Sequence, residues 1–377
     1  MKTGLYIHIP FCRQKCLYCA FYSVAARDGE YADAYAGALL REAEYFEERF
    51  FAQRKAEIAT LYIGGGTPSL LPVPFYAGLL EKLQRIFDLS NLEEVTFEAN
   101  PEHLSLAYLR ELYRQTPVRR LSIGVQSFSD ADLKLLNRRH SAQQALDAVE
   151  NACRAGFENL SVDLIYGIHP AGERSTWQDN LETLKSLQLP HFSAYALTVE
   201  PHTMLELKLA AGKMAIAGEE QVEKEYFFLQ EFAAGNGYEA YEISNYAQNG
   251  AYGLHNCNYW RDVPYIGLGA AAHSYLGDER HWNPASVRDY IQDPVSGKQG
   301  ERLQERDRYH EYVMTALRTV WGVRQEKIAA FSEPLRQEFH QRAEKEIKCG
   351  NLQHKGDAYI VSPAKRLLTD GIAASFF

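Results

Sequence analysis

Short runs rich in β-branched and aromatic residues recur between residues 4 and 198, each with the two-residue alternation of a β-strand. They predict strands over residues 4–10, 59–65, 93–99, 119–126, 159–167 and 191–198. Stretches with helical spacing lie between them, and this alternation predicts an α/β fold whose parallel sheet has right-handed crossovers. Six such units are too few for an eight-stranded barrel, so we expect a partial, open barrel of six strand–helix units.

The clearest helix spans residues 141–154. Its apolar residues follow the spacing of one helix face: Ala142, Ala145, Leu146, Val149, Ala152 and Cys153. Ser141 and Gln144 have the spacing of a capping box, and Gly156 follows the end of the helix. We therefore expect Cys153 to be packed on the buried face of this helix.

The alternation also assigns each strand residue to one face of the sheet. In the third, fourth and fifth strands, aliphatic side chains share one face, while Glu98, Gln126 and Asp163 lie on the other. We expect the aliphatic face under the helices and these three polar residues inside the barrel, near the C-terminal strand ends that carry active sites. One such residue could be a surface or loop-capping residue, but three in matching phase favour a polar site.

The pattern changes after residue 200. A helical stretch at residues 219–234 leads into a segment rich in aromatic residues and glycine. We expect residues 1–230 to form the partial barrel, 231–304 to extend it, and 305–377 to form a separate C-terminal module. That module is predicted to contain two helices, a hairpin and a short last helix, which together are similar to a winged helix.

Composition narrows the class of protein. The net charge of −9 argues against a protein that holds nucleic acid on a basic surface. A hydrophobic content of 46% is ordinary for a globular chain, and no apolar run approaches the ~20 residues that span a bilayer. The first residues lack the pattern of a signal peptide, so we expect a cytoplasmic protein that does not span a membrane.

The cysteines carry the first chemical signal. Six cysteines in 377 residues do not form a disulfide framework, and Cys349, at a helix end, has no partner pattern. Cys12, Cys16 and Cys19 instead stand together, directly after the first strand. Three thiolates suit a [4Fe–4S] cluster with one iron left open, which the amine and carboxylate of S-adenosylmethionine could chelate. The alternatives are a zinc site completed by His8, and three unrelated thiols.

A glycine run follows the second strand, in "YIGGGTPSLL". Consecutive glycines allow a backbone to approach a ligand closely. A P-loop is excluded because no Lys-Ser/Thr follows, and the dinucleotide-binding spacing is absent. Alone, the glycine run is equally consistent with a tight turn. Together with the cysteine motif, it indicates a ligand-binding site.

Taken together, the motifs resemble those of the HemN-like radical SAM proteins. The stretches that carry the resemblance are "YIHIPFCRQKCLYC", "YIGGGTPSLL", "FEANPEHL", "GVQSFSDADLKLLNRRH" and "VDLIYGI". The resemblance implies a partial (β/α)6 radical SAM barrel with a C-terminal HemN-type α+β domain. It implies that Cys12, Cys16 and Cys19 bind a [4Fe–4S] cluster. The residues implied to contact S-adenosylmethionine are Tyr6, Tyr18, Gly65, Gly66, Thr67, Glu98, Gln126, Arg138 and Asp163.

Two branches of that family differ near the cysteines. The oxygen-independent coproporphyrinogen III dehydrogenase branch has a fourth cysteine, where this chain has Phe21, and an N-terminal extension, for which the eleven residues before Cys12 leave no room. The haem-chaperone branch, HemW, lacks both and has an H-N-x-x-Y-W motif linked to haem. This chain has "HNCNYW", residues 255–260.

The motif implies haem binding, with His255 as the candidate iron ligand, because His is a common axial ligand of haem. Cys257 could instead supply a thiolate, and Tyr259 and Trp260 offer flat faces. Alternatively, His255 fixes a loop and Trp260 belongs to the core. We take the nearby His273 and His281 to be structural.

The resemblance thus implies a haem chaperone that carries a [4Fe–4S] cluster and S-adenosylmethionine. It would bind haem and pass it to acceptor proteins, respiratory enzymes among them, as a monomer or as a dimer promoted by the cluster. The alternative function is the oxidative decarboxylation of coproporphyrinogen III, and a structural iron–sulfur or zinc protein is the third class.

Overall fold

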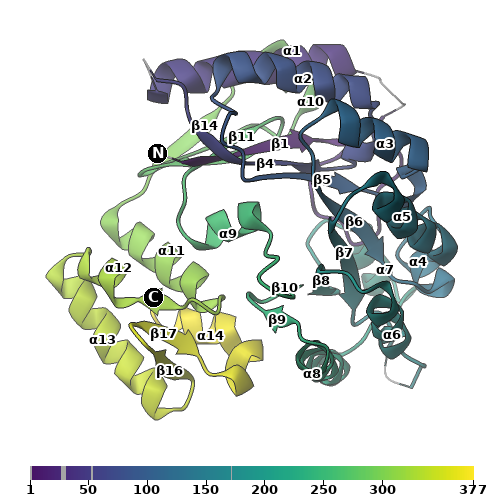
Figure 1. Ribbon diagram of the computed structural model, residues 1–377. Helices are drawn as coiled ribbons and strands as arrows, with labels where there is room; N and C mark the ends of the chain where they lie inside the picture. Colours follow the sequence, from purple (N-terminus) through teal and green to yellow (C-terminus); the bar gives the residue numbers. More distant parts are fainter. Residues whose placement is uncertain (1, 27–30, 52–53, 171) are drawn as a thin grey trace.

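The computed structural model describes residues 2–26, 31–51, 54–170 and 172–377. All six predicted strands are present: β1 (Thr3–Ile9), β4 (Ile58–Gly65), β5 (Glu94–Ala99), β6 (Arg120–Gln126), β7 (Asn159–Tyr166) and β8 (His191–Ala196). They lie side by side in this order, and every neighbouring pair is parallel. Figure 1 shows the sheet curving into an incomplete barrel, so the predicted α/β fold is confirmed.

Helices cover the outer face of this sheet (Figure 1). They are α1 (Ala32–Phe46), α2 (Val73–Ile86), α3 (Leu106–Gln115), α4 (Asp130–Leu135), α5 (Ala142–Ala155), α6 (Trp177–Leu187) and α8 (Glu219–Gly235). A π-helical turn (Glu47–Phe51) follows α1, and 3-10 turns (Pro68–Leu70, Pro101–His103) follow β4 and β5. The helices therefore alternate with the strands as the sequence pattern requires.

Helix α5 confirms the predicted cap and corrects one prediction. Ser141 and Gln144 form the capping box, and Gly156 ends the helix with a φ of 102°. Cys153, however, is exposed, so its predicted packing is wrong. The buried stripe of α5 is centred on Ala145, Ala148, Val149 and Ala152. One residue turns an α-helix by about 100°, which places Cys153 outside that stripe.

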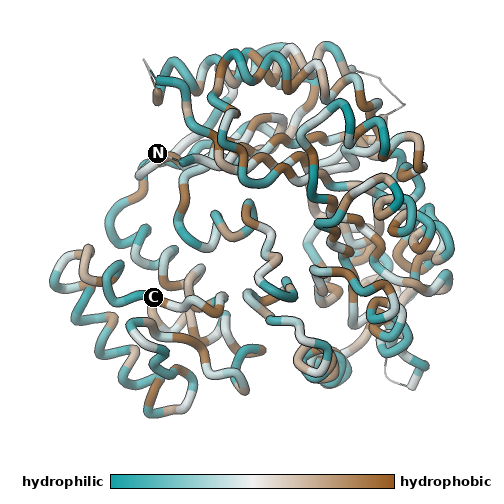
Figure 2. The backbone as a smooth tube through the Cα atoms, viewed as in Figure 1, coloured by the Kyte–Doolittle hydropathy of each residue, from teal (hydrophilic) through white to brown (hydrophobic). Residues whose placement is uncertain are grey.

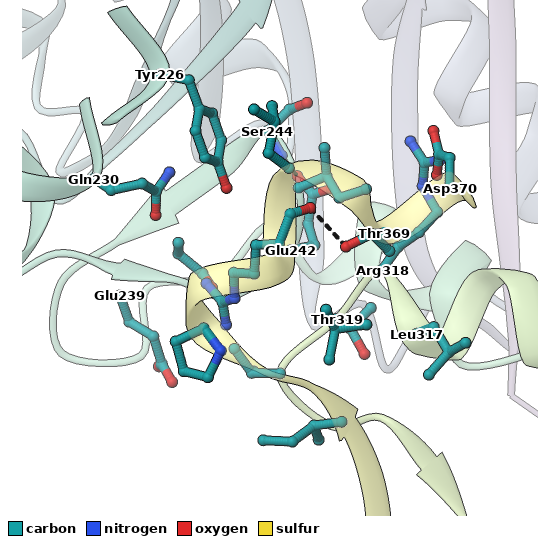
Figure 3. Close-up of a pocket in the computed structure, with 18 of the residues that line it drawn as sticks. Tyr226, Gln230, Glu239, Glu242, Ser244, Leu317, Arg318, Thr319, Thr369 and Asp370 are labelled. Atoms are coloured by element: carbon teal, nitrogen blue, oxygen red, sulfur yellow. Dashed lines mark hydrogen bonds and ion pairs between the residues drawn. The ribbon is translucent and has the colours of Figure 1, made fainter. Parts of the chain in front are cut away.

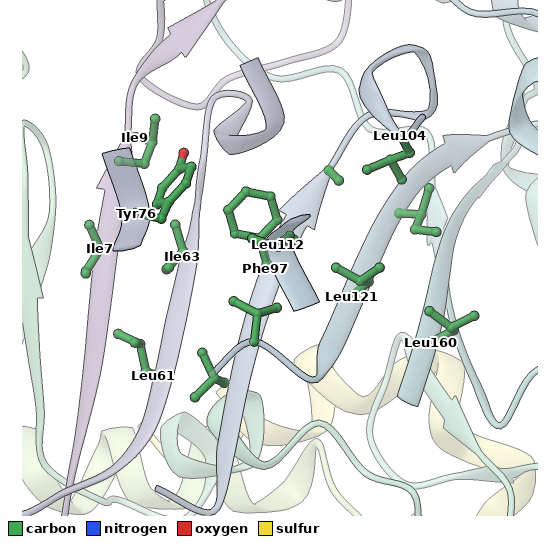
Figure 4. Close-up of a cluster of buried hydrophobic side chains, with 14 of the residues drawn as sticks. Ile7, Ile9, Leu61, Ile63, Tyr76, Phe97, Leu104, Leu112, Leu121 and Leu160 are labelled. Atoms are coloured by element: carbon green, nitrogen blue, oxygen red, sulfur yellow. The ribbon is translucent and has the colours of Figure 1, made fainter. Parts of the chain in front are cut away.

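The main core lies between the sheet and the outer helices (Figure 4). Leu61, Ile63, Phe97 and Leu121 are fully buried there, on the face that alternation assigned to the helices. Each contributes roughly 1.5–3 kcal/mol of burial free energy. In Figure 2, the strands contain many hydrophobic residues (brown), whereas the outer helices alternate between hydrophobic and hydrophilic residues (brown and teal). The side chains in phase with Glu98 are thereby left to face the inside of the barrel.

The segment after residue 235 extends both edges of the sheet. Beyond β8 come the antiparallel strands β10 (Asn245–Ala247) and β9 (Glu239–Ala240); beyond β1 come β11 (Tyr265–Leu268), parallel to β1, and the antiparallel β12 (His273–Leu276), β13 (Glu279–Trp282) and β14 (Gln299–Arg302). Helix α10 (Val287–Gln292) packs on α1. The buried carboxylate of Glu42 accepts hydrogen bonds from Asn283 Nδ2 (2.7 Å), Tyr290 Oη (2.5 Å) and Lys298 Nζ. Helix α1 is therefore bonded to the extension.

The C-terminal module has a hydrophobic core of its own, around Val313, Phe339 and Phe376. It contains α11 (Glu305–Leu317), β15 (Val323–Arg324), α12 (Gln325–Ala329), α13 (Glu333–Lys348), β16 (Leu352–Lys355), β17 (Ala358–Val361), a 3-10 turn (Pro363–Leu368) and α14 (Thr369–Ala374). Its strands form a three-stranded antiparallel sheet. The hairpin and the last short helix agree with the sequence pattern, while the domain boundaries at residues 230 and 304 stay predictions.

None of the helices among the described residues combines the length and the apolar character needed to cross a bilayer.

Candidate cofactor site at the mouth of the barrel

The three clustered cysteines follow β1 at the C-terminal end of the barrel. Cys12 lies in the short strand β2 (Phe11–Cys12), which pairs with β3 (Val24–Ala25). All three are free thiols, partly exposed. Thr67 Oγ1 donates to Cys12 Sγ (3.4 Å), and an Arg138 guanidinium nitrogen donates to Cys16 Sγ (3.3 Å). Two residues that the motifs single out thus contact the cysteine loop directly.

Distant parts of the chain hold the cysteine loop in shape. The Leu17 amide donates to the Leu136 carbonyl (3.3 Å), and Asn137 Nδ2 donates to the Lys15 carbonyl (3.0 Å). From the other side, the Leu205 amide at the start of α7 (Met204–Ala210) donates to the Leu17 carbonyl (2.9 Å). These contacts with distant residues add to the hydrogen bonds that the loop makes within its own sequence.

The thiols fit a polynuclear centre better than a single ion. Burial raises the pKa of Cys19, and the neighbouring thiols of Cys16 and Cys12 raise it further. Within the described residues, no three His, Cys, Asp or Glu side chains surround one ion position. His8 does not complete a zinc site, because its nitrogens are bonded to Tyr6 Oη (2.9 Å) and the Tyr22 carbonyl (3.0 Å). Thiolates beside a guanidinium suit an iron–sulfur cluster.

The glycine run lets β4 approach β1 and the barrel interior. A Cβ on Gly66 would lie 2.9 Å from backbone atoms of residues 9, 10 and 11, and the Gly66 amide donates to the Ile9 carbonyl (2.8 Å). Gly65 has a φ of 114°, where glycine is favoured, and a Cβ there would meet the His8 ring at 2.5 Å. Gly65 and Gly66 therefore allow β4 to lie close to β1 and to the residues just before Cys12.

Glu98 anchors the polar interior next to this turn. Its carboxylate accepts hydrogen bonds from Tyr62 Oη (2.6 Å) and from the Gly65 amide (2.9 Å). Burial raises the pKa of Glu98 to about 7, against the opposing effect of these two donors. The carboxyl group is therefore poised to gain or lose a proton near neutral pH.

Arg138 joins the cysteine loop to the strands. Besides Cys16, it donates to Asn100 Oδ1 (2.9 Å) and to the Gly124 carbonyl (2.6 Å). Its Nε is buried and has no hydrogen-bond partner in the structure. A buried donor without a partner costs about 1–3 kcal/mol, which a bound acceptor would recover. Arg138 therefore has one donor that a bound acceptor beside Cys16 could satisfy.

Gln126 ends β6 in a strained conformation, with a φ of 68°. Such outliers cost about 1–3 kcal/mol and concentrate at functional sites. A β-irregularity between Ile123 and Gln126 accompanies the strain, and a Cβ on Gly124 would lie 2.9 Å from Gln126 Nε2. The bend and the missing side chain at Gly124 leave room for Gln126 within the barrel.

Asp163 lies across the interior on β7. Ser122 Oγ donates to both of its carboxylate oxygens (3.2 and 3.3 Å). Burial raises the pKa of Asp163, while the neighbouring hydroxyl groups of Ser193 and Ser122 oppose the shift. Sequence reasoning missed Ser122 and Ser193, although Ser122 alternates in phase with Gln126 and could have been found from that signal.

The two predicted tyrosines also line this region. Tyr6 is the neighbour of Tyr62 in the β1–β4 register, with ring centroids 6.1 Å apart. Tyr18 stands beside Cys16 and Arg138, and its burial raises the pKa of its phenol. The predicted cysteines, Thr67 and Arg138 are thus in contact at the mouth of the barrel, whereas Tyr6 and Asp163 lie deeper, in the middle of β1 and β7. Sequence reasoning missed Asn100, which bonds Arg138.

The HNCNYW motif lies at the opposite end. It forms α9 (Leu254–Trp260), whose first amides, those of Leu254 and His255, donate to the Glu94 carboxylate (2.8 and 2.9 Å). Glu94 is the first residue of β5, whereas Glu98 stands near its last. Figure 1 shows α9 on the inner side of the sheet, so the motif helix covers the floor of the barrel.

His255 points into this floor and is 1% exposed. Its ring nitrogens are hydrogen-bonded to Thr60 Oγ1 (2.9 Å) and Tyr259 Oη (2.9 Å). Burial lowers the pKa of His255 to about 3, so the ring is neutral. In this conformation it fixes the helix, as the alternative interpretation of the motif expects. Its predicted role as a haem ligand stays a prediction.

The other candidates near the motif differ in their surroundings. Cys257 is buried, and burial raises the pKa of its thiol to about 12. His281 is buried with Nε2 3.0 Å from Glu279, whereas His273 is exposed and stacks on Trp282.

The chain is similar to known proteins over most of its length. The Radical SAM superfamily profile matches residues 6–187. The protein "Heme chaperone HemW" of Lactococcus lactis subsp. lactis (strain IL1403) is 36% identical over 327 residues, which cover 86% of this chain and 84% of the relative. The chain belongs to the HemW family of radical SAM proteins. The HemW protein of Escherichia coli (strain K12) is also 36% identical, over 72% of this chain and 69% of its own.

A solved structure supports the fold of the whole chain. Coproporphyrinogen III oxidase (HemN) from Escherichia coli, a radical SAM enzyme, matches with a TM-score of 0.82, over 100% of this chain and 90% of its own. Its sequence identity is 22%, so it bears on the fold alone. The predicted HemN-like barrel with its C-terminal domain is therefore confirmed as an architecture.

Proposed function

We propose that this protein is a haem chaperone: it binds haem and passes it to an acceptor protein. The observation that carries the proposal is the similarity to relatives named "Heme chaperone HemW", at 36% identity over 86% of the chain in one case. The HNCNYW motif and the residue Phe21 agree with that branch.

We assign the cofactors to the mouth of the barrel. Cys12, Cys16 and Cys19 would hold a [4Fe–4S] cluster, which supplies one electron to S-adenosylmethionine when both are bound. The residues assigned to S-adenosylmethionine are Tyr6, Tyr18, Gly65, Gly66, Thr67, Glu98, Gln126, Arg138 and Asp163. The unpartnered Nε of Arg138 supports this assignment, because it offers a buried donor to an anionic group.

The direct test is anaerobic reconstitution of the cluster followed by haem titration, with and without S-adenosylmethionine. We expect near-stoichiometric haem binding, and transfer of the haem to an acceptor apoprotein on mixing. Replacing the three cysteines by serine should remove iron and labile sulfide from the reconstituted protein, whereas Cys153→Ser, at an exposed site, should leave both unchanged. Zinc without labile sulfide would reject the cluster.

The second candidate function is oxidative decarboxylation of coproporphyrinogen III, because the chain shares its cysteine, glycine and polar motifs with that branch of the HemN-like proteins. Phe21, which stands where that branch has a fourth cysteine, is 71% exposed at the cysteine loop. An anaerobic assay with coproporphyrinogen III separates the two functions. Formation of protoporphyrinogen would refute a role limited to haem delivery.

The role of His255 needs a test of its own. Loss of haem binding in His255→Ala, with binding retained in the exposed-site control His273→Ala, is the result expected if His255 ligates the iron. A His255→Ala protein that binds haem with unchanged affinity and spectrum removes His255 as the ligand. Thermal unfolding of both variants reports separately on the hydrogen bonds that His255 makes to Thr60 and Tyr259.

The remaining parts of the proposal concern location and partners. We place the protein in the cytoplasm, with haem-dependent respiratory enzymes as acceptors. We expect a monomer that dimerises when the cluster is present, and sizing chromatography before and after reconstitution tests this expectation.

A further inference from the structure

A cleft of about 630 Å³ separates the barrel from the C-terminal module. Its barrel wall includes Tyr195 at the end of β8 and Tyr226 on α8; its other wall includes Arg318 and the last turns of the chain. Figure 3 shows Tyr226 and Gln230 on one side and Arg318 and Asp370 on the other. The volume lies within the roughly 300–1,000 Å³ typical of cofactor and ligand sites.

The lining of the cleft combines cations, carboxylates and aromatic rings. Its charged residues are Arg318, Lys355, Arg366, Glu239, Glu242 and Asp370, and its rings include Tyr195 and Tyr226. Arg366 also donates to the Ala240 carbonyl (2.8 Å), so its remaining donors are the ones open to a ligand. Arg318 forms an ion pair with Asp370, yet its Nε is buried and has no hydrogen-bond partner in the structure. Cations able to bind carboxylates, set beside flat apolar faces, suit a planar ligand that carries acidic groups.

A row of polar side chains leads from the inside of the barrel to the cleft. Asp163 stands opposite Ser193 in the β7–β8 register, and Ser193 Oγ donates to Asn245 Oδ1 (2.7 Å). Asn245 in turn donates to Glu242, a buried carboxylate that lines the cleft. A ligand in the cleft would therefore lie one short polar chain away from the proposed S-adenosylmethionine site.

The motif helix α9 also reaches the wall of the cleft. The Arg318 guanidinium lies 5.6 Å from the centre of the Trp260 ring, and that of Arg261 lies 4.0 Å from the Trp321 ring. Trp260 is the last residue of HNCNYW. Trp260 of the motif can thus position Arg318 in the wall of the cleft, although His255 of the same motif is buried at the floor of the barrel.

We propose that this cleft is the haem site, with the macrocycle between the barrel and the C-terminal module and its two propionates at Arg318, Lys355 and Arg366. The proposal deepens the proposed function and rests on it. It assigns the HNCNYW motif a positioning role: Trp260 holds the Arg318 side of the cleft.

The test uses the full chain with its cluster reconstituted, and two probes: haem, and haem dimethyl ester, which lacks the propionate charges. Replacing Arg366 or Lys355 by glutamine should weaken haem binding roughly tenfold each, since each removes a charged partner of a carboxylate. Arg336→Gln is the matched control, because Arg336 is bonded to Glu333 on α13 and does not line the cleft. It should bind haem as the unchanged protein does.

The ester separates lost charge recognition from general damage. The unchanged protein should bind the dimethyl ester more weakly than haem, and this difference should shrink in Arg366→Gln and Lys355→Gln. If these variants titrate like the control and the unchanged protein binds both probes equally, the cleft assignment is wrong while the proposed function stands. If the unchanged protein binds no haem at all, both fail.

Discussion

Gly66→Ala is the sharpest probe of how the sheet supports the cysteine loop. The added Cβ would lie 2.9 Å from Ile9 O, Pro10 C and Phe11 O, whereas ordinary contact begins at 3.4 Å. The obstacles are backbone atoms, so the segment ahead of Cys12 has to move by about 0.5 Å. Overpacking of this kind costs about 1–3 kcal/mol, and displacing the Gly66–Ile9 hydrogen bond adds about 1 kcal/mol.

We therefore expect Gly66→Ala to lower the free energy of unfolding by about 2–4 kcal/mol in urea titrations. It should also lower the iron and labile sulfide retained per chain after reconstitution, because the displaced segment carries Cys12. Gly78→Ala is the matched control, because a Cβ there meets no atom of the described residues within 4 Å and Gly78 lies inside α2. That change should stabilise the protein by up to about 1 kcal/mol.

The reasoning would be refuted by a Gly66→Ala protein with the stability and the cluster content of the unchanged chain. Equal destabilisation of Gly66→Ala and Gly78→Ala would also contradict it, since the close approach of β4 to β1 would then have no particular consequence.

Three further changes test other parts of the structure. Leu61→Ala should lower the free energy of unfolding by about 2–5 kcal/mol in urea titrations, whereas Leu207→Ala, at a 58% exposed position, should change it little. In the cofactor-free protein, the free energy of unfolding should fall as the pH rises from about 4.5 to about 7. The reason is that the pKa of Glu98 is raised to about 7 in the folded protein, so that between these pH values the folded state keeps the Glu98 proton and the unfolded state does not. Glu98→Gln should flatten this part of the stability–pH profile, and an unchanged slope would contradict the pKa shift. Ser141→Ala should lower the free energy of unfolding by about 1 kcal/mol, because it removes the N-cap of α5. Thermal unfolding measures the change, and an unchanged midpoint would contradict a stabilising role of the cap.

The sequence predicted the barrel because period-two alternation records which face of a strand is buried. That signal alone found Glu98, Gln126 and Asp163, and all three lie on the inner side of strands whose aliphatic residues pack under the helices. The same alternation contained Ser122. It could not reveal Asn100 or the contact of Arg138 with Cys16, since these depend on how separate loops meet in space.

The prediction for Cys153 failed because helical spacing shows which side of a helix is buried but not where the edge of the buried stripe lies. Ala152 is buried while its neighbour is exposed. The motif around His255 could be recognised in the sequence, but its position could not. Only the tertiary fold sets α9 against Thr60 and Glu94 at the floor of the barrel.

The scaffold of the cysteine loop has a consequence for biosynthesis. Cys12 leaves the ribosome early, but the partners that shape its loop, Leu136, Asn137 and Leu205, come much later in the chain. At ~5–20 residues per second, the 193 residues from Arg13 to Leu205 take roughly 10–40 s to make. During that interval the thiols exist without their binding geometry. Under the proposed assignment of a cluster to these thiols, we expect its insertion to follow translation of the barrel.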